Sequence, residues 1–315
     1  MNAMPVSSRW SRPAGVALLA AAAALPAIAS NYVIDVGLTI ATYSILGLGL
    51  NIVVGYAGLL DLGYAAFFAI GAYASAILTT RYGLGFWSAM LVGVLLSTIG
   101  GFLVSLVTFR VRGYYLALAT LAFAGLVRIV IGHWNGFTGG MMGIRAIPAP
   151  ALGPWVLDSP LALFYLSGAL CCLAVVLYNA IAYSMKGRAL MALRDNEMAA
   201  RASGLGVRQL KIVAFTLSAV FPAVGGSLMA HYYTAITPDL GSIQETVTML
   251  VIVIIGGLGS AAGALFGSAV VNLVPELFRD LGDYRLLAYG LILFGMILYQ
   301  PQGLFSIGRR LAWRP

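Results

Sequence analysis

The most informative property of this 315-residue sequence is how little charge it carries. Only 9% of its residues are charged, whereas a soluble globular protein carries about 25%. Its 18 basic and 10 acidic side chains are too few to cover a soluble body of this size. This scarcity excludes an ordinary soluble enzyme, a nucleic-acid-binding module and a disordered protein. With 61% hydrophobic residues and a mean hydropathy of +0.95, most of the surface must face lipid or other membrane-embedded protein.

Residues that bind metals or form disulfides are also scarce. The two cysteines, Cys171 and Cys172, are adjacent within one apolar run, and the two histidines, His133 and His231, are far apart. Neither pattern has the spacing of a disulfide framework or a metal site. The chain also has no G-x-x-x-x-G-K-[ST] phosphate loop. We therefore expect no catalytic residues, no metal and no cofactor in this chain, and no hydrolysis of ATP through such a loop.

Long apolar runs, in contrast, are abundant. A helix needs about 20 mostly apolar residues to cross the hydrocarbon core of a membrane. Such runs predict an all-α, polytopic membrane protein with one transmembrane domain over residues 1–315. The first run could instead be a cleaved signal peptide, because basic residues precede it and Ala27-Ile28-Ala29 resembles a cleavage site. The runs cover residues 14–30, 36–54, 62–80, 86–109, 113–134, 161–183, 212–233 and 286–299.

Residues 246–275 form an uncharged stretch that fits neither one span nor two. As one straight helix it would reach about 45 Å, well past a hydrocarbon core of about 30 Å. Gly256, Gly257 and Gly259 lie at its middle, where they weaken a helix. We predict a short half-helix, a turn at these glycines and a second helix that runs back. The chain then has about ten segments, one of them short or re-entrant.

The basic residues indicate the orientation. If the N-terminus is cytoplasmic, the basic segment 184–211 and the C-terminal arginines also fall inside, as the positive-inside rule requires. We therefore predict that both termini are cytoplasmic. Segment 184–211 is the most charged part of the chain. Asp195 or Asn196 could cap a short exposed helix from Glu197 to Ser203, which Gly204 could end. The segment is either a solvated loop that sets orientation or a docking site for a soluble partner.

The segment also carries a pattern. Met198-Ala199-Ala200 followed by Gly204 resembles the E-A-A-x-x-x-G coupling loop of ABC importer permeases, with Met198 at the usual glutamate and Glu197 beside it. Further blocks begin at Gly55 (G-Y-A-G-L-L-D-L-G-Y), Arg110 (R-V-R-G-Y-Y-L-A-L-A-T) and Ile254 (I-I-G-G-L-G-S-A-A-G). In this order they resemble the M-type permease subunit of the high-affinity branched-chain amino acid ABC importers, from about residue 35 to 305.

The resemblance implies an ABC importer permease fold in the bacterial inner membrane. It implies an H-type partner permease, two cytoplasmic ATPases that bind ATP and magnesium, and a periplasmic binding protein. Alternating access would import leucine, isoleucine or valine from the periplasm, or, as in other relatives, urea and short amides or aromatic acids. The coupling element for the ATPases would consist of Arg188, Arg194, Glu197, Ala199, Ala200 and Gly204.

A secondary transporter and a membrane-embedded enzyme are the alternatives to an importer permease. A secondary transporter should place carboxylates or histidines in the membrane as ion sites, but run 212–233 and stretch 246–275 contain no acidic residue. A membrane-embedded enzyme would need paired catalytic polar groups, and no convincing constellation is present.

Two glycine runs are candidates for the translocation path or its gate. Gly55 and Gly58, like Gly256, Gly257 and Gly259, interrupt apolar segments. Irregular backbone at membrane depth must be buried in protein or line a cavity. Close helix packing through small residues is the alternative to contact with substrate, and we favour it.

The remaining candidates are polar. Asp61 lies at a predicted cytoplasmic turn, where we expect it to be solvated. Arg128 lies about 9 Å from the outer end of its span, where it either snorkels or attracts a substrate carboxylate. Similar permeases often have glutamate at the position of Gly125, so Arg128 here needs another partner. In the outer loop 134–160, Thr138, Gly139 and Gly140 form either a turn or a set of backbone N–H groups for an anion.

Overall fold

The computed structural model describes residues 31–108, 111, 113–152, 155–278, 290 and 295. The predicted run 14–30, nearly all of run 286–299, Arg110 and the two ends of the chain lie outside the described residues. The signal-peptide alternative and the sidedness of the termini therefore stay predictions.

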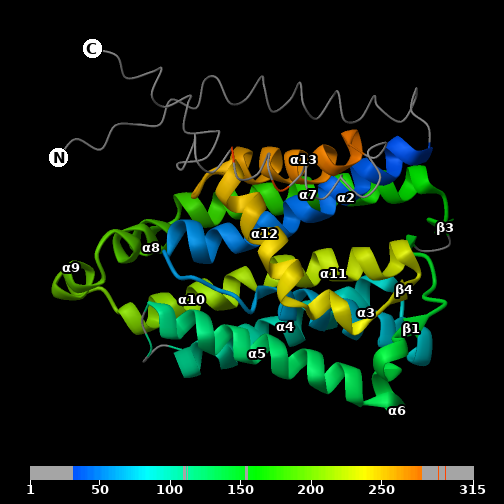
Figure 1. Ribbon diagram of the computed structural model, residues 1–315, viewed down its shortest axis with the longest axis horizontal. Coiled ribbons are helices and arrows are strands. Elements are labelled where there is room, and N and C mark those ends of the chain that lie inside the picture. The colour runs from blue at the N-terminus through cyan, green and yellow to red at the C-terminus, as the bar shows by residue number, and fades with distance from the viewer. Residues whose placement is uncertain are drawn as a thin grey trace.

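The described residues form a bundle of helices that run roughly alongside one another (Figure 1). Within the part of the chain that the structure describes, five helical segments are long and apolar enough to cross a membrane: Asn31–Tyr56, Phe86–Thr108, Tyr114–His133, Pro160–Tyr183 and Val207–Tyr233. This confirms an all-α, polytopic membrane protein, while the total of about ten segments stays a prediction. The helices are α2 (Asn31–Leu50), η2 (Asn51–Tyr56, a π-helix), α3 (Tyr64–Tyr82), α4 (Phe86–Thr108), α5 (Tyr114–His133), α6 (Asn135–Thr138), η3 (Gly140–Met142), α7 (Pro160–Tyr183), α8 (Met185–Asp195), α9 (Glu197–Ala202), α10 (Val207–Ser218), α11 (Val220–Tyr233), η4 (Pro238–Gly241), α12 (Ile243–Gly256) and α13 (Ala261–Leu277).

Helices α12 and α13 form the predicted hairpin. They span about 21 Å and about 26 Å by helix rise, so each is shorter than a complete crossing. A Cβ atom on Gly256 would collide with the carbonyl oxygen of Gly263, and one on Gly267 with that of Ile252. This pairing shows that the two helices run antiparallel with their backbones in contact. The turn between them is Gly257–Ser260, called the hairpin tip below, in which Gly257 and Gly259 have φ values of 107° and 79°.

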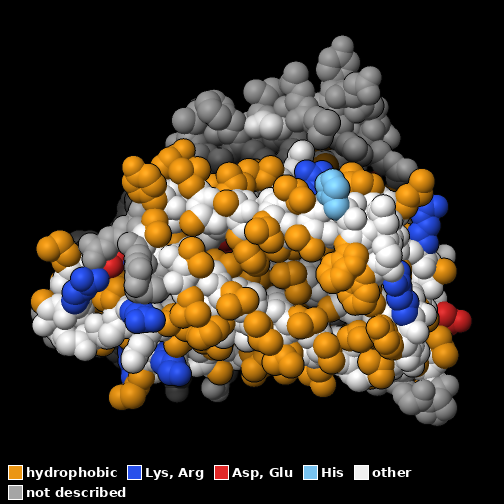
Figure 2. Space-filling view, turned by 90° about the horizontal axis from the view of Figure 1, so that it is seen from below, with side chains coloured by type: hydrophobic (Ala, Val, Ile, Leu, Met, Phe, Trp, Pro, Cys, Tyr) orange, Lys and Arg blue, Asp and Glu red, His pale blue; other side chains and the backbone are white. Residues whose placement is uncertain are grey.

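Close backbone contact also builds the core around α3. A Cβ atom on Gly71 would collide with the backbone of Ala223 in α11, and one on Gly226 with the carbonyl oxygen of Phe68 in α3. Small residues permit this approach, which lipid-immersed helices use in place of a hydrophobic driving force. Figure 2 shows the complementary outer surface, where apolar side chains cover most of the middle and basic side chains lie mainly toward the two ends. This distribution is that of a protein embedded in a membrane.

The two ends of the bundle differ (Figure 1). Helices α8 and α9 project at one end, and short strands gather at the other. There β1 (Ile144–Arg145) pairs antiparallel with β4 (Ala235–Ile236), and β2 (Ala151–Leu152) with β3 (Trp155–Val156). The β1–β4 pair ties the outer loop 134–160 to the connection that leads into α12.

Candidate functional site at the coupling-loop end

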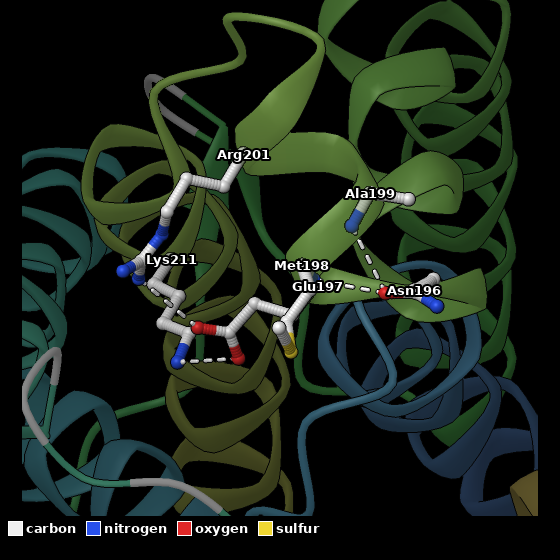
Figure 3. Close-up of polar contacts among 6 residues, drawn as sticks. All are labelled: Asn196, Glu197, Met198, Ala199, Arg201 and Lys211. Carbon is white, nitrogen blue, oxygen red and sulfur yellow. Dashed lines mark hydrogen bonds and ion pairs between the residues drawn. The ribbon is translucent and has the colours of Figure 1, made fainter.

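The predicted exposed helix in segment 184–211 is present as α9. The Asn196 side-chain oxygen accepts hydrogen bonds from the backbone N–H groups of Met198 and Ala199, at 2.9 Å and 3.0 Å (Figure 3). Gly204, with a φ of 80°, follows the last turn and donates its N–H to the carbonyl oxygen of Arg201 at 3.1 Å. Asn196 is thus the cap, and the helix ends at Ala202, one residue before the predicted end, because Gly204 adopts the left-handed conformation.

An ion pair fixes α9 against α10. The Glu197 carboxylate lies 3.3 Å from Nζ of Lys211 and 3.5 Å from Nη2 of Arg201 (Figure 3). The Lys211 side chain is only 2% exposed, whereas that of Arg201 is 61% exposed. Lys211 is the last residue of the charged segment 184–211, and its place in that segment predicts no buried ion pair for it. The sequence signal that could have indicated its burial is the position of Lys211 on the helical face that also carries Leu210 and Ala214.

The faces of α9 differ in exposure. Met198 is 75% exposed and Ala199 is exposed, while Ala200 packs beneath them and is 4% exposed. At Gly204 an added Cβ atom would have no atom of the described residues within 4 Å, apart from its own chain neighbours. Ala199, Gly204 and Met198 are thus open to a partner, and Ala200 serves the packing of the loop.

The two predicted arginines of the coupling element have different surroundings. Arg188 donates to the carbonyl oxygen of Tyr183, the last residue of α7, at 3.4 Å. The Nη1 of Arg194 donates instead to the carbonyl oxygen of Gly55 at 2.5 Å. The Arg194 side chain also packs on Gly58, where an added Cβ atom would lie 2.8 Å from its Cγ. The structure therefore joins a predicted coupling residue to two predicted gate residues.

The two glycine runs meet at this place. Asn51 in η2 accepts a hydrogen bond from the Gly259 N–H at 2.7 Å and donates one to the Ser260 carbonyl oxygen at 3.1 Å. An added Cβ atom on Gly55 would collide with the Asn51 side chain and lie 2.7 Å from the Gly259 nitrogen. Close packing therefore explains Gly55, and Gly256 packs in the same way on Gly263. Sequence reasoning missed Asn51, although an amide within the apolar run 36–54 was a visible signal.

The expectation that Asp61 is solvated is wrong, because its side chain is fully buried. The connection 57–63 folds against α5, where the Leu62 N–H donates to the hydroxyl of Thr120 at 3.0 Å. The Gly63 N–H donates to Oδ1 of Asp61 at 2.9 Å. Burial raises the pKa of this carboxyl from 3.8 to about 6. The sequence neighbours of Asp61 predict a turn that faces water. In the structure, this turn packs on α5, and the packing encloses the carboxyl.

Arg128 has a partner from a distant part of the chain. Its Nη2 lies 2.7 Å from Oδ1 of Asp239 in η4, and the two side chains are 47% and 68% exposed. Asp239 thus supplies the carboxylate that is missing at Gly125. The pair ties α5 to the connection that enters α12.

We expect the Arg128–Asp239 pair to contribute modestly to stability, and to tolerate an exchange of its two charges. Asp239→Arg should lower the free energy of unfolding through like-charge repulsion, by about 1 kcal/mol or less because both groups are half exposed. The measurement is the melting temperature of the purified protein, which should fall slightly. The double variant Arg128→Asp with Asp239→Arg should recover most of that loss. A double variant no better than the single one would show that the ion pair does not hold η4.

Thr138, Gly139 and Gly140 lie at the opposite end from α9. The Thr138 hydroxyl donates to the carbonyl oxygens of Ile131 and Trp134, at 2.5 Å and 2.9 Å. Gly139 and Gly140 have φ values of 79° and 60°. This is a turn whose residues are explained by local bonding, as the turn-rich interpretation predicts. Among the described residues, no group of three or more His, Cys, Asp or Glu could hold a metal ion.

Comparison with known proteins gives the family. The family described as "Branched-chain amino acid transport system / permease component" matches residues 32–300. The chain is 37% identical to the high-affinity branched-chain amino acid transport system permease protein LivM of Escherichia coli (strain K12), over 93% of this chain and 75% of LivM. It is 23% identical to the corresponding LivH of Salmonella typhimurium, over 84% of this chain and 91% of LivH, and 23% identical to the ribose import permease protein RbsC of Haemophilus influenzae, over 81% and 80%. No solved structure matches the chain. The extent of the match shows that this chain belongs to the family of permease components of branched-chain amino acid transport systems.

Proposed function

We propose that the chain is a transmembrane permease subunit of an ATP-driven importer that takes up leucine, isoleucine and valine from the periplasm. The observation that carries the proposal is α9, a short helix that is capped by Asn196, held by Glu197 and Lys211, and open to a partner at Met198 and Ala199. A rigid exposed helix of this kind suits docking to a motor protein, because little order has to be gained on binding.

In this proposal the two ATPases dock from the cytoplasm on the coupling loops of the two permeases, one of which contains α9, and both termini of this chain also lie in the cytoplasm. A second permease resembling LivH completes the membrane part, a binding protein delivers substrate, and ATP and magnesium belong to the ATPases. Closure of the ATPases then moves the helices joined to α9 and switches access from the periplasm to the cytoplasm. Urea and short amides or aromatic acids are the alternative substrates.

A second candidate function has one observation in its favour. A secondary transporter needs ionisable groups as ion sites, and Asp61, in the connection between η2 and α3, is a fully buried carboxyl. The two functions separate cleanly in cells that express the complete set of subunits. ATP-driven import predicts that uptake of labelled leucine stops on ATP depletion. Uptake that survives ATP depletion but collapses with an ionophore would favour the secondary transporter.

The docking surface has a sharp test in Gly204→Leu. A leucine here strains the backbone, because Gly204 has a positive φ. Its Cβ atom meets no other described residue beyond its chain neighbours, so the side chain would meet the ATPase instead. We expect the purified permease to lose its ATPase subunits and the cells to lose uptake. Gly83→Leu is the matched control, because Gly83 also has a positive φ, of 63°, and an open surround, but follows α3 at the other end. Equal retention of the ATPases in both variants would remove α9 as the docking site.

A further inference from the structure

Three segments far apart in sequence converge on the inner side of the coupling loop. They are η2 with the following turn, Arg194 in the last turn of α8, and the hairpin tip. Arg194 bonds to Gly55, Asn51 bonds to the hairpin tip, and the tip also lies beside Arg194. An added Cβ atom on Gly259 would be 3.8 Å from Nη1 of Arg194.

Arg194 lies close enough to α9 along the chain to move with it. Only Asp195 and the cap residue Asn196 separate it from α9. Its hydrogen bond reaches the carbonyl of Gly55, near the C-terminal end of the helix formed by α2 and η2. The last carbonyls of a helix have no partner within it, so an arginine from another segment can hold one. A displacement of α9 is thereby passed to η2.

The π-helix η2 also contacts the hairpin tip. Asn51 and Tyr56 are five residues apart, which is the hydrogen-bonding interval of a π-helix and directs both side chains toward the same neighbour. Asn51 bonds the Gly259 N–H and the Ser260 carbonyl, and the Tyr56 hydroxyl donates to the Gly259 carbonyl at 3.3 Å. Asn51 is fully buried. Its bond to the Gly259 N–H pairs a backbone donor, while the Ser260 carbonyl oxygen also accepts the Ala264 N–H at 3.1 Å.

The base of the hairpin is held by α2 and α3. The Tyr43 hydroxyl donates to Oε2 of Glu245 in the first turn of α12 at 2.9 Å. Thr246 accepts the N–H of Ala65 at 3.1 Å, which ties the same turn to the start of α3. With its base tied also to α3 and its tip held by Asn51, the hairpin is arranged to tilt when η2 moves.

We propose that Asn51 and Arg194 are positioning residues that transmit the movement of the coupling loop to the hairpin tip, which acts as the inner gate. The inference rests on the proposed function, because it assumes a motor that moves α9. It gives Arg194 a role within the permease, where its sequence position alone had suggested contact with the ATPase. It also gives Gly55 a reason to lack a side chain, since a Cβ atom there would separate η2 from the tip, whereas at Gly259 the φ of 79° favours glycine.

The test uses the complete importer reconstituted in liposomes. The variants are Asn51→Ala and Arg194→Ala, with Arg194→Lys as the conservative change and Asn272→Ala as the matched control. Asn272 lies in the same hairpin, but its amide bonds within α13, to the Ser268 carbonyl oxygen at 2.8 Å. The first readout is the number of ATP molecules hydrolysed per leucine imported. We expect Asn51→Ala and Arg194→Ala to raise this number about tenfold while ATP hydrolysis continues, and Arg194→Lys to recover part of the coupling.

The second readout follows the tip directly. Spin labels are placed at Leu258→Cys in the tip and Tyr82→Cys at the far end of α3, with Cys171 and Cys172 replaced by alanine. Leu258 and Tyr82 are 44% and 65% exposed, so both accept a label. Adding ATP and vanadate should change the distance between the labels in the parent protein and in Asn272→Ala. The same addition should leave the distance unchanged in Asn51→Ala and Arg194→Ala.

The outcomes separate the two proposals. A parent importer that moves leucine without ATP overturns the proposed function. A parent that requires ATP, with normal coupling and normal tip movement in both alanine variants, overturns only the inference. Arg194→Ala keeps the test decisive if Asn51→Ala does not fold, because α8 still packs through the buried Leu190 and Leu193.

Discussion

Gly256→Val is expected to prevent the α12–α13 hairpin from closing and to give the largest loss of stability of any change considered. A Cβ atom at this position collides with the carbonyl oxygen and carbon of Gly263, which are backbone atoms and cannot rotate away. Overpacking of a tight core costs about 1–3 kcal/mol, and more when the backbone must shift. The measurement is the melting temperature of the purified protein, together with its yield as a monodisperse species.

The matched control for this change is Gly168→Val in α7. Gly168 is also a helical glycine within a spanning segment, but an added Cβ atom there has nothing within 4 Å. We expect this variant to melt close to the parent. If the two valine variants lose stability equally, helix propensity rather than backbone contact sets the cost, and the close-packed hairpin is refuted.

Glu197→Ala is expected to release α9 from α10 and to abolish uptake while the protein still inserts into the membrane. The change leaves the Lys211 ammonium buried without the carboxylate that now compensates it. Removing one partner of a fully buried pair costs about 3–5 kcal/mol, and here we expect about 2 kcal/mol because the Glu197 side chain is 23% exposed. Limited proteolysis within segment 184–211 should become faster, and the ATPases should no longer co-purify.

Arg201→Ala provides the control on the same carboxylate. Arg201 also pairs with Glu197, but its side chain is 61% exposed, so its loss should cost about 0.5 kcal/mol or less. The double variant Glu197→Ala with Lys211→Met should protect the loop from protease again, because an apolar side chain suits the buried position. A double variant that is cleaved as fast as Glu197→Ala would show that the charge on Lys211 is not the cause.

Much of the fold follows from patterns that are local in sequence. The apolar runs predict helices, and the uncharged stretch 246–275 with its central glycines predicts a hairpin, which α12 and α13 confirm. The exposed helix α9 follows from Asn196 and Gly204, whose effects reach only a few residues along the chain. Some boundaries were displaced, since the helix predicted to begin at residue 212 starts at Val207, where an amphipathic turn buries Lys211.

The sequence by itself determined the membrane environment, the helical class and the short capped helix, because these depend on composition and on spacings of a few residues. Only the tertiary structure decided which polar groups meet. Asp239 is 111 residues from Arg128, Gly55 is 139 residues from Arg194, and Gly259 is 208 residues from Asn51. Likewise, the burial of Asp61 depends on the packing of a turn against α5. Such pairings are set by how helices pack in three dimensions, and no local pattern of apolar and polar residues encodes them.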